Sequence, residues 1–186
     1  MLGLPVAVDV RGGGFVPAVR DGFAWLRDVE QCGVAAGWAG QRFAEWLRAA
    51  GAENFRIDVG SDVITAGEPE PGGRWRVGVR HPWRIDRMCA VLSLADHAVA
   101  TSANDMRGTG TEPAPTGGPV AELASLTVVA ADLAVAQATA AMGRAKGRAG
   151  IAWADAQPGC LVFAVTGDGF VQHSAELATL LDAGRS

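Results

Sequence analysis

Residues 98–119 read AVATSANDMRGTGTEPAPTGGP, and residues 123–143 read LASLTVVAADLAVAQATAAMG. The first stretch begins as a short apolar strand and continues as a loop that is rich in Gly, Pro and Thr. The second predicts a buried strand over 126–130, followed by an Ala-rich helix over 133–142. Small side chains along that helix suit close packing. The order strand, long loop, strand, helix therefore anchors the expected fold.

The flanking residues show both helical and strand periodicity. Apolar residues recur at helical spacing from Phe15 to about Val29 and again from about Gly37 to Ala50. Further strands are predicted at 5–10, 55–59, 63–66, 75–79, 89–94, 98–101, 160–165 and 170–172. We expect 89–94 to pair with 98–101, and Gly167-Asp168-Gly169 to turn a hairpin. The sequence thus predicts an α+β fold with mixed, mostly antiparallel sheets packed with helices.

The composition of the chain limits the kinds of molecule that we expect it to bind. The chain has 186 residues, 49% of them hydrophobic and 19% charged, and a net charge of −4, which indicate a globular domain. The net charge is negative and the basic residues form no continuous run, so we expect no nucleic-acid partner. The N-terminal apolar run is too short for a signal peptide or a membrane span. Cys32, Cys89 and Cys160 have no metal-ligand spacing and are expected to be reduced thiols, in a cytoplasmic protein with no membrane partner.

The usual catalytic motifs are missing from the sequence. It contains no Walker loop, no GxGxxG, no GxSxG and no HExxH. Its three histidines, His81, His97 and His173, are too scattered to argue for a hydrolase triad. The sequence therefore names no catalytic residue.

Four segments, in this order, resemble the FAD:protein FMN transferases, the ApbE-type flavin transferases: residues 29–55, 59–67, 75–102 and 123–143. The resemblance implies an ApbE-like, T-fold-like architecture. It implies transfer of FMN from FAD to a Thr or Ser hydroxyl of an acceptor flavoprotein, with assistance from Mg²⁺. Val29 follows the first helix almost directly, where the family has a longer stretch. We therefore expect a single ApbE-like domain over residues 1–186 that lacks part of the family's N-terminal flavin-pocket region.

The resemblance also assigns residues to the expected site. Glu30, Asp62, Ser102 and Arg107 match positions that contact the flavin nucleotide, and the Gly33 carbonyl and the Thr139 hydroxyl match ligands of the metal. Some of these residues also have a simpler structural interpretation. Asp62 suits a tight turn, Thr139 suits a packed helix face, and Gln137 could offer only a weak cation ligand. Asp132 is better placed as a helix N-cap than as a metal ligand.

Other positions depart from the family pattern in ways that bear on activity. Where the family has working side chains, this sequence has Ala36, Met106, Gly110, Pro113 and Val135. We therefore expect a flavin transferase with impaired activity. The alternative is a catalytically inactive homologue that binds flavin or a partner protein. A third interpretation is that another chain, or a homodimer, supplies the missing pocket.

Overall fold

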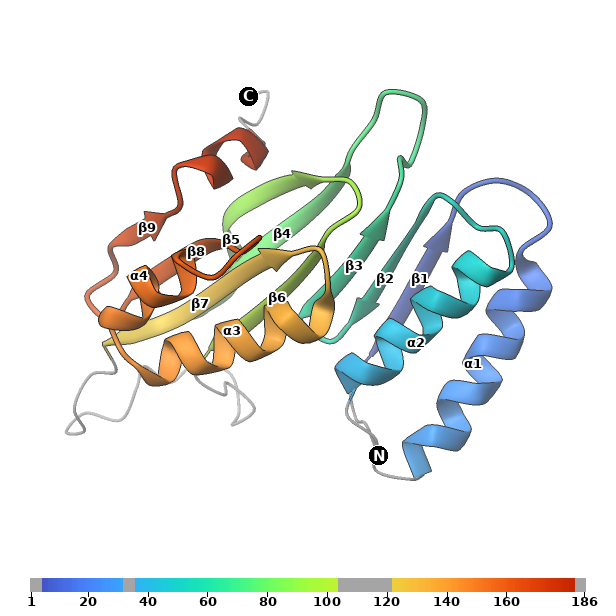
Figure 1. The fold of residues 1–186 in the computed structure, drawn as a ribbon, viewed down its shortest axis with the longest axis horizontal. Coiled ribbons are helices and arrows are strands. Elements are labelled where there is room, and N and C mark those ends of the chain that lie inside the picture. Colours follow the sequence, from blue (N-terminus) through green and yellow to red (C-terminus); the bar gives the residue numbers. More distant parts are fainter. Residues whose placement is uncertain (1–4, 32–35, 104–121, 183–186) are drawn as a thin grey trace.

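The computed structural model describes residues 5–31, 36–103 and 122–182. A seven-stranded sheet forms its centre, and all neighbouring strands run antiparallel (Figure 1). In spatial order the strands are β1 (Val6–Val10), β2 (Phe55–Val59), β3 (Asp62–Ala66), β6 (Ala98–Ala103), β7 (Leu123–Ala130), β8 (Leu161–Thr166) and β9 (Val171–His173). Strand β7 is buried along its whole length, as expected for a central strand that is covered on both faces.

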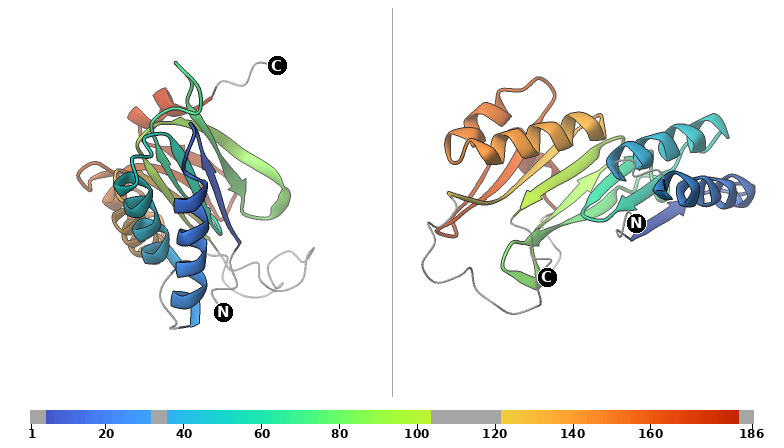
Figure 2. Two further views of the ribbon diagram at one scale, coloured as in Figure 1. Left: turned by 90° about the vertical axis from the view of Figure 1, so that its right-hand side faces the viewer. Right: turned by 90° about the horizontal axis from the view of Figure 1, so that it is seen from below.

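Helices cover one face of this sheet (Figure 2). The paired helices α1 (Val16–Gln31) and α2 (Ala36–Ala49) lie over β1, β2 and β3, while α3 (Leu133–Ala145) and α4 (Ala149–Asp155) lie over β6, β7 and β8. The core between helices and sheet includes Phe43, Leu47, Ile57, Leu126 and Leu133, each fully buried. No helix in the described residues is long and apolar enough to cross a membrane.

A two-stranded hairpin covers the opposite face. It consists of β4 (Trp75–His81) and β5 (Arg84–Leu94), and the short 3-10 helix η1 (Glu176–Leu180) lies beside it. Val77 and Leu92 of the hairpin pack with Val99 and Val129 of the main sheet in a second core. The indole Nε1 of Trp75 donates a 3.0 Å hydrogen bond to the carbonyl of Ala66, which ties the base of the hairpin to the end of β3.

The predicted α+β class and most predicted elements are confirmed. The expected pairing of 89–94 with 98–101 is wrong, because β5 pairs with β4 while β6 lies between β3 and β7. Asp96, with φ of 57°, turns the chain between β5 and β6, so the two strands enter different sheets. Helix α4 is an additional element. It packs closely against α3, where a Cβ on Gly150 would lie 1.7 Å from the Gly143 carbonyl oxygen.

Candidate functional site

One end of the main sheet, here called the loop end, collects several turns and chain ends. Because neighbouring strands are antiparallel, the β2–β3 turn, the end of β6, the start of β7 and the β8–β9 turn all lie there. In Figure 1 this end of β7 lies away from the N-terminal end of α3. Loops at one end of a sheet commonly carry the functional residues of a fold. Polar side chains at the loop end are therefore the first candidates for a site.

Asp62 is the first residue of β3 and lies on the helix-covered face, because it alternates with the core residues Ile64 and Ala66. Gln137 Nε2 donates a 2.6 Å hydrogen bond to Asp62 Oδ2, and the backbone N–H of Thr101 donates a 3.3 Å bond to Oδ1. Burial raises the pKa of the Asp62 carboxyl above its ordinary value, against the lowering effect of these hydrogen bonds. Both carboxylate oxygens are therefore engaged within the protein.

Gln137 brings three elements together at this point. Its amide contacts Asp62 of β3 and also lies against Gly37 in the first turn of α2. A Cβ on Gly37 would lie 2.1 Å from Gln137 Oε1, so glycine is what allows the amide to fit there. The start of α2, an amide from the middle of α3 and the carboxylate at the start of β3 thus lie close together. We call Gly37, Asp62, Thr101 and Gln137 the Asp62 cluster.

Ser102 lies on the same helix-covered face as Asp62. It is paired with Leu126 of the helix-side core, whereas its neighbour Thr101 is on the other face. Thr101 Oγ1 lies 2.8 Å from Thr127 Oγ1 on the hairpin side. The structure therefore brings two of the predicted site residues, Asp62 and Ser102, to one face at the end of adjacent strands.

Thr139 occupies a different side of α3 from Gln137. The two residues are two positions apart, which is about 200° around a helix. Thr139 is only 6% exposed, and its Oγ1 lies 3.8 Å from the Sγ of Cys160. The α3 side chain that reaches Asp62 is thus Gln137, a residue that the sequence marked only as a weak cation ligand. Its contact depends on the rotation of α3, which the Ala-rich sequence of that helix does not reveal.

The other predicted site residues lie beyond the described part of the chain. Gly33 and Arg107 fall outside the described residues, as do Met106, Gly110 and Pro113. Glu30 lies in the last turn of α1, but its side chain is outside what the structure describes. The expected capping role of Asp132 is confirmed, because its Oδ1 accepts a 3.1 Å hydrogen bond from the Val135 N–H.

The described residues fit a resident Mg²⁺ ion poorly. They contain no group of three His, Cys, Asp or Glu side chains that could hold a metal. In the Asp62 cluster the one carboxylate is already bonded on both oxygens, by an amide and by a backbone N–H. Mg²⁺ is usually held by one or two carboxylates with water and substrate phosphates. The donors present in the cluster make a hydrogen-bonded network and not a preformed cation site.

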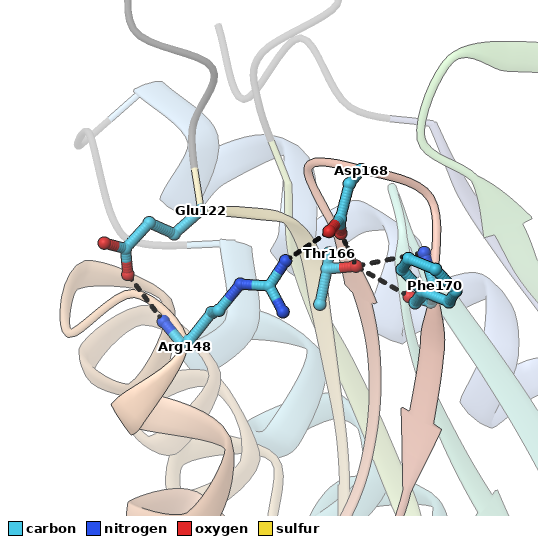
Figure 3. A network of polar contacts seen from close by, with 5 residues as sticks. All are labelled: Glu122, Arg148, Thr166, Asp168 and Phe170. Carbon is cyan, nitrogen blue, oxygen red and sulfur yellow. Dashed lines mark hydrogen bonds and ion pairs between the residues drawn. The ribbon is translucent and has the colours of Figure 1, made fainter.

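A second polar network fixes the chain at the loop end (Figure 3). Glu122, just before β7, accepts a 2.9 Å hydrogen bond from the backbone N–H of Arg148. The Arg148 guanidinium reaches Asp168 at 2.5 Å, and the hydroxyl of Thr166 donates to the same carboxylate. Thr166 also accepts a 3.0 Å bond from the N–H of Phe170. The network joins α4, β7 and the β8–β9 turn, of which the sequence predicted the strand and the turn but not α4.

A cavity of about 460 Å³ lies beside this network. Its lining includes Glu122, Arg144 and Lys146. Lys146 is the one lysine of the chain, and its Nζ also lies 5.2 Å from the ring of Trp153. Two cationic side chains and one carboxylate therefore line a cavity near the point where β7 begins.

Comparisons with known proteins agree with this fold. The model of the ApbE family matches residues 27–163. An FAD:protein FMN transferase of Vibrio cholerae is 27% identical over 73 residues, which are 38% of this chain and 22% of that protein. The solved structure of the flavin transferase ApbE from Vibrio cholerae has a TM-score of 0.62 and 26% identity, over 80% of this chain and 51% of that one. The ApbE protein of Thermotoga maritima shares the fold, with a TM-score of 0.66 and 24% identity over 81% of this chain and 52% of that one. The chain therefore spans about half the length of these solved structures.

Proposed function

Because this chain belongs to the ApbE family, we propose that it binds FAD and is a flavin transferase whose turnover is strongly impaired. The reaction would move FMN from FAD to a Thr or Ser hydroxyl of an acceptor protein, with AMP as the leaving group. One observation carries the proposal. Asp62 lies at the point where β3, α2 and α3 meet, and its carboxylate is paired with the neutral amide of Gln137.

Transfer of FMN breaks a pyrophosphate bond, and this sets chemical demands. Such reactions need positively charged groups close to the phosphate oxygens, and a proton acceptor for the attacking hydroxyl. Arg144 and Lys146 line a cavity at the loop end and could supply positive charge. Asp62 could accept a proton, but both of its oxygens already accept hydrogen bonds. Loss of a positioned acid–base group typically lowers a rate by about 10²–10⁴.

The family resemblance implies Mg²⁺ assistance, but the described donors do not fit such an ion, and no step is assigned to it. Thr139 is not proposed as a ligand, because its hydroxyl lies against Cys160. The Gly33 carbonyl stays a prediction from the resemblance. Asp62 and Ser102 are the residues that we propose to contact the flavin nucleotide. Glu30 and Arg107 are proposed for the same role from the resemblance alone.

The alternative is a homologue without transfer activity that binds flavin or a partner protein. The Asp62–Gln137 pair also supports this function, because it leaves a folded site without a metal-binding pair of carboxylates. We further propose that the domain lacks part of the family's N-terminal flavin-pocket region. A second copy of the chain is one source for that region.

Incubation of the purified chain with FAD, Mg²⁺ and an acceptor protein distinguishes these functions. Covalent flavin on the acceptor, seen as fluorescence in a denaturing gel, supports a transferase. Tight FAD binding without covalent flavin supports the inactive homologue. The variants Asp62→Asn and Ser102→Ala should weaken FAD binding, while Arg20→Ala, on an exposed part of α1, should not. Failure of the unmodified chain to bind FAD would reject the transferase and the flavin-binding homologue, and would leave the homologue that binds a partner protein.

A further inference from the structure

The β4–β5 hairpin carries a concentration of positive charge in an otherwise acidic chain. Residues 74–88 contain five arginines and one acidic residue, Asp86. The rest of the chain then holds 11 basic and 19 acidic residues. The arginines are Arg74, Arg76, Arg80, Arg84 and Arg87, and all five are exposed. A positive patch on an acidic protein indicates an anionic partner.

Strand alternation places much of this charge on the outer face of the hairpin. Trp75, Val77 and Val79 are buried against the main sheet, so Arg76 and Arg80 point outward between them. On β5, Met88 is paired with Arg80, and its thioether lies over Gly78. The hairpin stands on the face of the sheet away from the helices, as Figure 2 shows. Its outer face is therefore a two-stranded surface that faces away from the rest of the protein.

Most of these arginines are not neutralised within the protein. Arg76 forms a 2.7 Å ion pair with Asp182. Arg74, Arg80, Arg84 and Arg87 form no ion pair with any of the described residues. The positive charge that lacks an acidic partner thus extends toward the tip of the hairpin.

Two large apolar side chains are exposed among these charges. Trp83 occupies the turn between β4 and β5 and is 38% exposed, and Met88 is 54% exposed. The backbone N–H of Trp83 donates a 3.2 Å hydrogen bond to His81 Nδ1, and the two rings meet edge to face with their centroids 5.6 Å apart. These contacts hold the indole at the tip, between Arg80 and Arg84. Tryptophan beside arginine is a combination suited to the boundary between lipid headgroups and acyl chains.

The sequence predicted no membrane partner, but the exposed side chains of the hairpin argue otherwise. We propose that the outer face and tip of the β4–β5 hairpin dock on an anionic phospholipid surface. The arginines contact the lipid phosphates, and Trp83 and Met88 enter the headgroup–acyl boundary. A bilayer presents a phosphate layer directly above an apolar layer, so it meets both the charged and the apolar side chains. An acidic protein surface would complement the arginines but would place Trp83 and Met88 against charged groups. A juxtamembrane basic residue contributes about 1 kcal/mol, or roughly fivefold in affinity.

Co-sedimentation with lipid vesicles tests the proposal without any need for flavin. We expect the chain to bind vesicles of phosphatidylcholine mixed with phosphatidylglycerol, and not vesicles of phosphatidylcholine alone. Arg80→Gln combined with Arg84→Gln should weaken binding about 25-fold, because two charges are removed. Trp83→Ser should weaken it while leaving its salt dependence unchanged. The matched control is Arg20→Gln with Arg42→Gln, which removes two exposed arginines of α1 and α2 and should have little effect.

Several results would overturn the proposal. One is no binding to the anionic vesicles at low ionic strength, where electrostatic attraction is least screened. Another is an equal loss in the control variant, which would mean that charge anywhere on the surface suffices. Tighter binding to polyglutamate than to vesicles, with the same loss in the arginine variant, would point to an acidic protein instead. If the double variant does not fold, Arg87→Gln alone should still weaken vesicle binding about fivefold.

Discussion

Gln137 of α3 and Asp62 of β3 are joined by a 2.6 Å hydrogen bond between an amide N–H and a carboxylate oxygen, 75 positions apart in the sequence. The contact links the helix layer to the end of the sheet, beside the first turn of α2. It puts an uncharged partner at a place where a second carboxylate could help Asp62 to hold a metal ion. The chemistry of the site can therefore be changed at a single side chain.

Gln137→Glu should create a site that responds to Mg²⁺. The variant puts a second carboxylate against Asp62, and two carboxylates at this distance resist ionising together. A divalent cation relieves that repulsion, so Mg²⁺ should raise the thermal midpoint of the variant. At 100 times the dissociation constant, the gain is about 2.7 kcal/mol. Thermal unfolding with and without Mg²⁺ measures it, and Met142→Glu, at an exposed position of α3, is the control. An equal response in the control would contradict the placement of the site.

Asp62→Asn should change how stability depends on pH. Burial raises the pKa of folded Asp62 above its ordinary value of 3.8, so the unfolded chain ionises first as pH rises. The unmodified protein therefore loses stability as pH rises from 3.8 through the folded pKa. The asparagine side chain does not titrate, so the stability of the variant relative to the unmodified protein should increase across that window and then level off. Urea unfolding at a series of pH values measures the difference. A constant difference, or one that shrinks as pH rises, would be the contrary result.

Gly150→Ala should destabilise the fold through the contact between α3 and α4. The added Cβ would lie 1.7 Å from the Gly143 carbonyl oxygen, a backbone atom that can yield only if the helices separate. Overpacking of this kind costs about 1–3 kcal/mol, and a backbone clash belongs at the upper end. Chemical denaturation gives the free energy of unfolding. Gly13→Ala is a matched control, since its Cβ would meet nothing within 4 Å. A cost no larger than that of the control would show that α4 moves freely.

Thr166→Val and Arg148→Ala should each raise the pKa of Asp168. The hydrogen bond from the Thr166 hydroxyl is the first cause of the lowered Asp168 pKa, and the Arg148 guanidinium lowers it further through its hydrogen bond and its charge. Losing the hydroxyl also removes the acceptor for the Phe170 N–H. Titration of the carboxyl by NMR gives the pKa, and hydrogen exchange of the Phe170 amide reports the loss of that bond. If Thr166→Val left the pKa of Asp168 unchanged, the hydroxyl would not be a cause of the lowered pKa and the assignment would be wrong.

The sequence predicts the strands and helices well where apolar periodicity is strong. The alternation of Phe55, Ile57 and Val59 matches β2, and the helical spacing of Phe43 and Leu47 matches α2. Strand pairing was less predictable, because the pattern of 89–94 does not say which sheet it enters. The turn at Asp96, with its positive φ, decides that, and a non-glycine residue gives little warning of such a turn.

The site was predictable only in part for a similar reason. Asp62 begins β3 and Ser102 lies near the end of the adjacent strand β6, and alternation puts both on one face. On α3, however, small residues surround Gln137 and Thr139, so composition does not fix which of them faces the sheet end. The packing of Gly143 against α4 and of Thr139 against Cys160 sets that rotation, and both are tertiary contacts.

The two outer strands of the main sheet are short. β9 has three residues and β1 has five, and Pro5, which has no N–H to donate, stands just before β1. A neighbouring molecule that added a strand to either margin would gain few main-chain bonds. The sheet is thereby protected against edge-to-edge aggregation, even though Phe170 and Val171 are exposed at the β9 margin.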